Sequence, residues 1–171
     1  MKLSLRFVLP LLVVLFLIAL GVTPLIETLT FRWFTRDLDL RGKLISNAVH
    51  DSLIRRLTSG TKSDILFLLT KITLDDRLMA AGYCTSDGML QYKTELFPKE
   101  IKCLDPEFEI KQSKVMKLKG GNVHIVKNPL MEKNKLFGYV FLIHDMSFIE
   151  KRSKDTKWYI FMFFISLGIV T

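Results

Sequence analysis

Residues 83–92 read YCTSDGMLQY, and this stretch marks the change from helical to strand patterning in the middle of the chain. Asp87 and Gly88 lie between two short runs that contain aromatic and apolar residues. An Asp-Gly pair in this position is a strong signal for a β-hairpin, because both residues tolerate the backbone angles of a tight turn. The stretch therefore predicts two antiparallel strands.

Further strands are expected on the C-terminal side of this hairpin. Residues 113–118 and 122–127 flank Gly120-Gly121, which predicts a second hairpin. The run LFGYVFLIH, residues 136–144, is the strongest strand signal because it is dense in aromatic and β-branched side chains. About five short strands joined in this way predict an antiparallel sheet.

Two helices are expected on the N-terminal side. Apolar residues recur every three to four positions over residues 25–57, which predicts a long amphipathic helix that ends near Gly60. Residues 61–64 have the spacing of a capping box, and residues 65–81 then follow as a second helix. Helices on one side of an antiparallel sheet give an α+β domain, the architecture of PAS-like and Cache-like sensor domains.

Both ends of the chain are strongly apolar. Residues 7–26 contain no charge and would span about 30 Å as a helix, the thickness of the hydrocarbon layer. An uncleaved anchor is favoured over a secretory signal peptide because the run exceeds the usual apolar core of about 7–15 residues. Residues 158–171 are also uncharged and begin with Trp158 and Tyr159. We interpret them as the first part of a second transmembrane helix in a longer protein, with a short C-terminal helix as the alternative.

These features divide the chain into four segments. Residues 1–26 form the anchor, residues 27–60 the stalk helix, residues 61–150 the α+β domain, and residues 151–171 a juxtamembrane helix with the start of the second span. Lys2 and Arg6 favour a cytoplasmic N-terminus, whereas the basic residues on the far flank favour the reverse. Since charge bias weakens for loops above about 60 residues, we expect the middle domain outside the cytoplasm of an inner-membrane protein.

The charge pattern and motifs exclude several functions. The net charge is +8, but Lys residues are scattered rather than gathered in a stripe, so nucleic-acid binding is not expected. The three histidines lack the spacing of metal ligands, and the chain contains no phosphate-binding loop or catalytic-serine motif. We therefore expect no metal, no cofactor and no catalytic residues in residues 1–171.

Three pairs of residues are candidates for other roles. Cys84 and Cys103 can form a disulfide outside the cytoplasm, or stay buried free thiols. Arg77 and Tyr83 are candidates for lining a ligand pocket, although a surface position at a helix end is the simpler interpretation of Arg77. His144 and Asp145 close the last strand, with Asp145 as an N-cap, and are candidates for the junction through which a signal leaves the domain.

Five segments of the sequence resemble a known family, namely SLRFVLPL (4–11), PLIETLTFRWFTRDLDLRGKLISNAV (24–49), DRLMAAGYCTSDG (76–88), FPKEIKC (97–103) and GYVFLIHDMSFIEKRS (138–153). They resemble the N-terminal input region of proteobacterial membrane proteins that end in a trehalose-6-phosphate synthase-type glycosyltransferase. The resemblance implies an anchor, an extracytoplasmic sensor-like domain, a second span and a HAMP linker. It implies a UDP-forming glycosyltransferase as the whole protein, but no catalytic residue of that enzyme corresponds to a position in this chain.

The expected function is that of an input module. It would be anchored in the lipid bilayer and would form a homodimer through the stalk helix. A small-molecule ligand would bind it, and it would regulate a cytoplasmic output domain. One alternative is the input region of a HAMP-linked kinase or cyclase. Another is a secreted or structural envelope protein with a cleaved signal peptide.

Overall fold

The computed structural model describes residues 2–106, 108, 112–147, 151, 158, 159, 162, 163 and 166. Its elements, in chain order, are α1 (Lys2–Ser59), α2 (Lys62–Ile72), β1 (Leu78–Thr85), β2 (Leu90–Lys93), β3 (Ser113–Leu118), β4 (Gly121–Glu132) and β5 (Lys135–Asp145). The chain divides into two compact units, one of residues Thr35–Ser147 and one of Met1–Phe34 with Phe148–Thr171. Each unit is described by itself.

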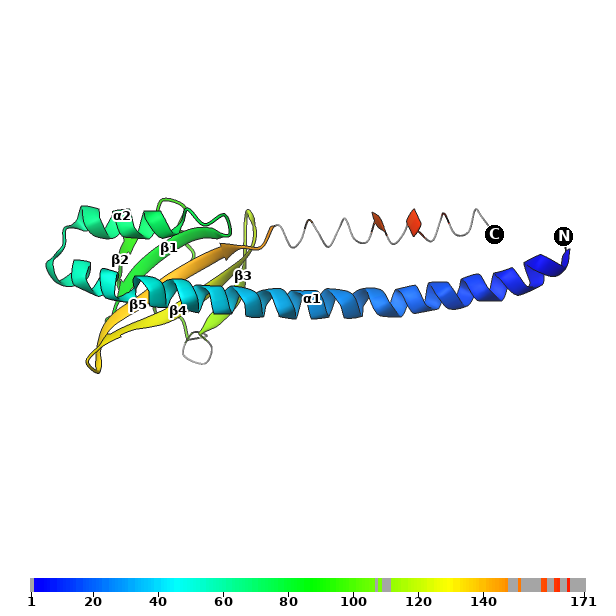
Figure 1. Cartoon of the computed structure of the whole chain (residues 1–171), viewed down its shortest axis with the longest axis horizontal. Coiled ribbons are helices and arrows are strands. Elements are labelled where there is room, and N and C mark those ends of the chain that lie inside the picture. Colours follow the sequence, from blue (N-terminus) through cyan, green and yellow to red (C-terminus); the bar gives the residue numbers. More distant parts are fainter. Residues whose placement is uncertain are drawn as a thin grey trace. The chain divides into compact units, whose positions relative to one another are not determined.

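The unit of residues 35–147 is built on a five-stranded antiparallel sheet with the order β2-β1-β5-β4-β3 (Figure 1). β5 is the central strand, and it pairs with β1 on one side and β4 on the other. Both expected hairpins are present, β1–β2 around Gly88 and β3–β4 around Gly120. The predicted α+β fold with a five-stranded antiparallel sheet is therefore confirmed.

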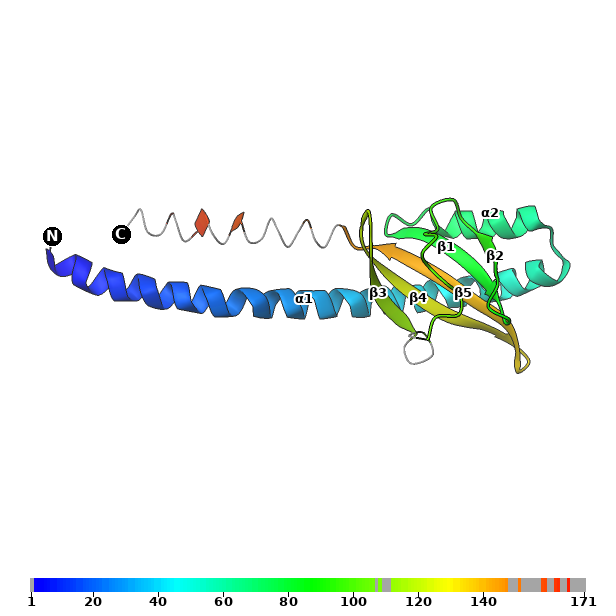
Figure 2. The same ribbon diagram turned by 180° about the vertical axis from the view of Figure 1, so that it is seen from behind.

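The two helices cover one face of this sheet, as the views from both sides show (Figures 1 and 2). α2 begins with the predicted capping box, in which Thr61 and Asp64 satisfy each other's backbone N–H groups. The core between helices and sheet consists of Leu53, Ile54, Ile65, Leu69, Leu78, Ala81, Tyr83, Leu130, Val140 and Leu142.

The opposite face of the sheet is covered by the segment between β2 and β3. Its core consists of Ala80, Cys84, Phe97, Ile101, Cys103, Phe108, Val123, Ile125, Phe141 and Ile143. Gly82 allows the close approach here, because a Cβ atom at this position would lie 2.4 Å from Phe97 Cε2. Sequence patterning did not identify this segment as the cover of a second core.

The predicted second helix is wrong at its C-terminal end. Helix α2 stops at Ile72, and residues 78–81 belong to β1 instead. The run Leu-Met-Ala-Ala has good helix propensity, but Ala80 and Ala81 pair with Ile143 and Leu142 of β5. Tertiary pairing with the central strand therefore overrides the local preference.

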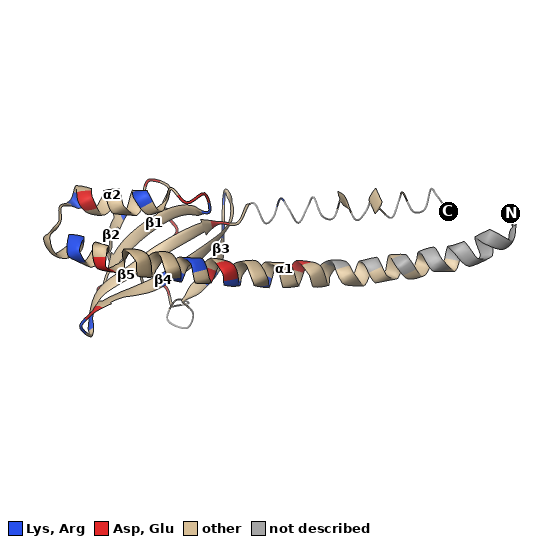
Figure 3. Ribbon diagram, viewed as in Figure 1, with Lys and Arg blue, Asp and Glu red and all other residues tan. Residues whose placement is uncertain are grey.

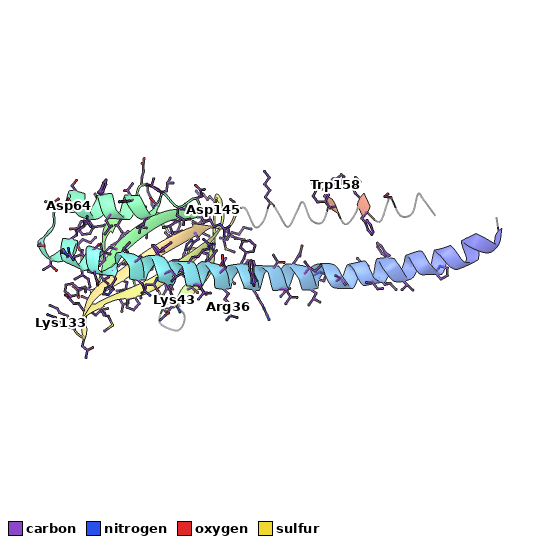
Figure 4. All side chains as sticks on the ribbon, viewed as in Figure 1. Arg36, Lys43, Asp64, Lys133, Asp145 and Trp158 are labelled. Carbon is purple, nitrogen blue, oxygen red and sulfur yellow. A yellow bond between two sulfur atoms is a disulfide. The ribbon has the colours of Figure 1, made fainter. Side chains whose placement is uncertain are left out.

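The long hairpin between β4 and β5 was not predicted. Its turn is formed by Lys133 and Asn134, which have φ angles of 47° and 64° (Figure 4). Two consecutive positive φ angles fit the twist of a two-residue hairpin, and neither residue is glycine. Because of this turn, β4 extends to Glu132, five residues beyond its expected end.

The other unit contains the apolar N-terminal part of α1. One described helix, Phe16–Ser59, is long and apolar enough to cross a membrane, although a signal sequence near an N-terminus meets the same criterion. Figure 3 shows Lys, Arg, Asp and Glu on the 35–147 unit and on the adjoining part of α1. The second span predicted at residues 158–171 lies mostly outside the described residues.

The C-terminal part of α1 belongs to the compact unit that contains the sheet. The compact unit begins at Thr35, so the last 25 residues of α1 group with the sheet. Leu38, Val49 and Leu53 are buried on this part of α1. The predicted stalk of residues 27–60 thus includes a helix that forms one layer of the domain.

Candidate functional site

The most unusual polar feature of the 35–147 unit is a pair of buried histidines. His124 on β4 and His144 on β5 are direct partners in the strand register, and their ring centroids lie 6.2 Å apart. Their exposed fractions are only 2% and 1%. Since Ile125 and Ile143 belong to the core on the opposite face, alternation along the strands directs both rings toward α1.

An acidic residue of α1 lies against this pair. The distance from His124 Nε2 to Asp39 Oδ1 is 3.2 Å. Nearby, Asn128 Nδ2 donates a hydrogen bond of 3.3 Å to the Gly42 carbonyl oxygen. A Cβ atom on Gly42 would come within 3.0 Å of Val126, so the glycine lets the helix lie close to β4.

Burial keeps both histidines neutral at neutral pH. Burial is the main reason why the pKa of His144 falls to about 4; His124 and Arg41 also lower it, while the Arg77 backbone and Asp75 oppose the shift. Burial also lowers the pKa of His124, against the opposing charge of Asp39. Among the described residues, neither ring nitrogen of His144 has a hydrogen-bond partner, nor does Nδ1 of His124.

Partly exposed charges lie near the pair. Asp37 on α1 lies 3.0 Å from Arg41 Nε and 3.6 Å from Arg77 Nη1, so it joins the helix to the turn before β1. The Asp145 backbone N–H donates to the Arg77 carbonyl oxygen over 3.3 Å, which ties the same turn to the end of β5. Helix α1, the turn that precedes β1 and the end of β5 are therefore joined to one another beside the histidine pair.

The end of β5 is organised by Asp145 (Figure 4). Its carboxylate accepts hydrogen bonds from the Ser147 backbone N–H at 2.8 Å and from the Ser147 hydroxyl at 2.7 Å. Met146 is buried, and its N–H donates to the Asn122 carbonyl oxygen. These bonds form a local turn at the end of β5, and the N-cap role of Asp145 stays a prediction because residues 148–150 lie outside the described part of the chain. The role of His144 and Asp145 as a signal junction stays a prediction.

The structure does not bring Arg77 and Tyr83 together. Arg77 immediately precedes β1, and Tyr83 lies six positions further along the chain within that strand, about 20 Å away at the rise of an extended strand. The Arg77 side chain is half exposed, whereas Tyr83 is buried and donates a 2.7 Å hydrogen bond from its hydroxyl to the Phe137 carbonyl oxygen. Burial raises the pKa of the Tyr83 phenol. A shared ligand pocket stays a prediction.

Cys84 and Cys103 form a disulfide, with Cα atoms 6.0 Å apart. It ties β1 to the segment that covers the second core. In the described part of the chain, no cluster of three or more His, Cys, Asp or Glu side chains could hold a metal ion.

Sequence patterning missed the central feature of this site. His124 and His144 are 20 positions apart and have no motif spacing, so only the strand register brings them together. The spacing of residues along the predicted helix does not mark Asp39 as their partner either. Alternation along the two strands is the one sequence signal that points both histidines to the same face.

Comparison with known proteins gives a fold and no family. No family model matches the chain, and no curated protein matches it. A solved structure of a domain from a sensory box/GGDEF family protein of Vibrio parahaemolyticus has a similar fold, with a TM-score of 0.50 and 12% sequence identity. The similarity covers 70% of this chain and 58% of that chain. This likeness fits the PAS-like architecture expected from the order of the elements.

Proposed function

We propose that this chain is the membrane-anchored sensor module of a signal-transduction protein. The observation that carries the proposal is the fold itself: a five-stranded antiparallel sheet of PAS-like architecture, similar to a sensory box domain, in a chain whose first helix is apolar enough to cross a membrane. The described residues offer no metal cluster that would favour metal-dependent catalysis instead.

In this proposal the 35–147 unit lies outside the cytoplasm, held at the inner membrane by the N-terminal anchor and by a second span at the C-terminal end. The Cys84–Cys103 disulfide supports this placement, because such bonds persist in oxidising compartments and are rare in the cytosol. A small-molecule ligand or another condition of the cell envelope would act on the domain. The end of β5, at His144 and Asp145, would pass the change to the second span as a shift between two packings.

The proposed output is a cytoplasmic trehalose-6-phosphate synthase-type glycosyltransferase joined through a HAMP linker. Sequence resemblance alone supports this choice, and a HAMP-linked kinase or cyclase is the competing output. The coding sequence that follows codon 171 decides between them. A HAMP segment followed by a glycosyltransferase domain would support the proposal, and a kinase or cyclase domain would contradict it.

A homodimer through α1 completes the proposal. Leu40 and Leu44 have exposed fractions of 55% and 68%, and they lie one helical turn apart on α1. Apolar residues at this spacing form the seam of paired helices. Two copies in parallel would bury this seam and couple their spans.

Placement outside the cytoplasm can be tested with the full chain in a Gram-negative host. Ser52 lies exposed on α1, and the chain's two cysteines are bonded to each other, so Ser52→Cys provides a single free thiol. We expect a membrane-impermeant maleimide to label this variant once the outer membrane is opened. The unsubstituted chain is the control and should stay unlabelled. Labelling only after lysis, together with reduced Cys84 and Cys103, would place the domain in the cytosol and refute the proposal.

A further inference from the structure

The buried histidine pair destabilises the fold, and the need to fill space in the core does not explain why two imidazole rings lie there. Two imidazole rings face each other on neighbouring strands at 6.2 Å, and both are almost fully buried. Among the described residues, three of their four ring nitrogens make no hydrogen bond of ordinary geometry, and the Arg77 backbone is a polar group that acts on His144. A buried polar group without a partner costs about 1–3 kcal/mol, whereas apolar residues would fill the same site without that cost.

The charges around the pair decide where protons can bind. α1 contributes Asp37, Asp39 and Arg41, the turn before β1 contributes Asp75 and Arg77, and the two strands contribute the histidines and Asp145. Asp37 is engaged by Arg41 and Arg77, and Asp145 is engaged by Ser147. Among the described residues, Asp39 is the carboxylate that contacts the pair, and it does so at His124.

We propose that the His124–His144 pair is a proton-binding site, and that its protonation loosens α1 from the sheet. This inference rests on the proposed sensor function and names the proton as an input to it. Each step is the uptake of one solvent proton by a neutral imidazole to give an imidazolium ion.

The two protons have different consequences. The first goes to His124, where the Asp39 carboxylate at 3.2 Å compensates the new charge. The second goes to His144, which has no carboxylate at hydrogen-bond distance in the described part of the chain and already faces a charged ring. A buried, unpaired charge of this kind is costly, and the fold relieves it by admitting water.

α1 is the element that moves away from the pair when both rings are protonated. β4 and β5 are joined by ten register pairs along their length, from Val123–Asp145 to Glu132–Lys135. Around the pair, α1 contacts the rest of the domain through polar groups, namely Asp39 with His124, Asp37 with Arg77 and Gly42 with Asn128. Further along the helix, Leu53 and Ile54 stay packed in the core, so the proposed opening is confined to the part of α1 over the pair. Opening the helix–sheet contact hydrates both rings without breaking the strand ladder.

The test uses the full chain in lipid nanodiscs and reads the helix–sheet contact directly. Ser46 is buried on α1, with an exposed fraction of 5%, and Ser46→Cys is nearly isosteric. Ser52→Cys on the exposed side of the same helix is the matched control. Both thiols are labelled with a disulfide reagent that reacts at acid pH. The labelling rate of Cys at position 46 is divided by the rate at position 52, so the pH dependence of thiol reactivity itself cancels.

We expect this ratio to rise about 30-fold between pH 7.5 and pH 5.0, since the ordinary histidine pKa of about 6.5 is restored when the site opens. His144→Phe, which fills the site but binds no proton, should reduce the rise to less than about 3-fold. His50→Gln removes the half-buried third histidine, which lies on α1 beside Asp51, and should leave the rise unchanged.

A second measurement holds even if His144→Phe does not fold. In histidine NMR spectra of the unsubstituted chain, the His144 signals should remain those of neutral imidazole below the ordinary pKa of about 6.5, and should change only together with the exposure of residue 46. A flat labelling ratio, or charging of both rings near pH 6.5 with residue 46 still protected, would overturn the inference. Failure here leaves the topology result with Ser52→Cys intact, so the two proposals fail separately.

Discussion

Acid should lower the free energy of unfolding of the 35–147 unit, and the burial of His144 determines by how much. The pKa of His144 is about 4 in the folded chain, and the ordinary value is about 6.5. Below pH 6.5 the unfolded chain therefore binds a proton that the folded chain does not. The free energy of unfolding falls as the pH drops from about 6.5 to about 4, and this contribution levels off below that range.

The size of the loss follows from the difference in pKa. About 2.5 pKa units at about 1.4 kcal/mol per unit give up to about 3 kcal/mol for a side chain that is 1% exposed. Other groups also contribute to the pH dependence, and Asp64 does so at lower pH because its hydrogen bonds with Thr61 lower its pKa below the ordinary value. The contribution of His144 is therefore best measured as a difference between two chains.

The assay is urea unfolding of the full chain and of His144→Phe in nanodiscs, followed by near-ultraviolet circular dichroism at pH 7.5, 6.0, 5.0 and 4.0. The two chains share every other titrating group, so the gap between their unfolding free energies isolates His144. Between pH 7.5 and pH 5.0, we expect the free energy of unfolding to fall by about 2 kcal/mol more in the unsubstituted chain than in His144→Phe. Parallel pH profiles would refute the reasoning, because His144 would then have the same pKa in both states.

Three other predictions concern the disulfide, the second core and the helix surface. Replacing both Cys84 and Cys103 with alanine should lower the unfolding free energy by roughly 3 kcal/mol in a urea titration at pH 7.5, because the bond closes a loop of about 20 residues; an unchanged midpoint would contradict this. Gly82→Val should cost at least about 1–3 kcal/mol, because its side chain would overlap Phe97, and Phe97→Ala in the same chain should recover part of the loss. Leu44→Glu should weaken self-association in sedimentation or cross-linking without changing the urea midpoint, since this side chain is 68% exposed; unchanged association would exclude the proposed seam.

Local chemistry explains the parts of the fold that were predicted correctly. The turn at Asp87-Gly88 and the capping box at Thr61 and Asp64 each depend on residues within four positions of one another. Such signals can be read before any tertiary contact is known. The alternation in the central strand, residues 136–144, is equally local because neighbouring side chains face opposite sides of the sheet.

Tertiary contacts decided the parts that the prediction missed. Residues 78–81 are helix formers that become a strand because β5 supplies their hydrogen-bond partners. Phe97 and Ile101 lie in a polar, lysine-rich segment with no periodicity, yet they cover a second core that the Cys84–Cys103 disulfide closes. No window of sequence contains this information, because the surface that they bury is assembled from distant strands.

The sequence by itself determined the class of this protein: an apolar N-terminal helix, two hairpins and an α+β domain. Only the tertiary structure placed His124 opposite His144 and brought Asp39 of α1 against them. The physical reason is that side-chain polarity and turn preference act over a few residues, whereas the partners of a buried charge are set by strand register and by the seating of a helix on a sheet. The proton site proposed for this chain depends on those two long-range choices.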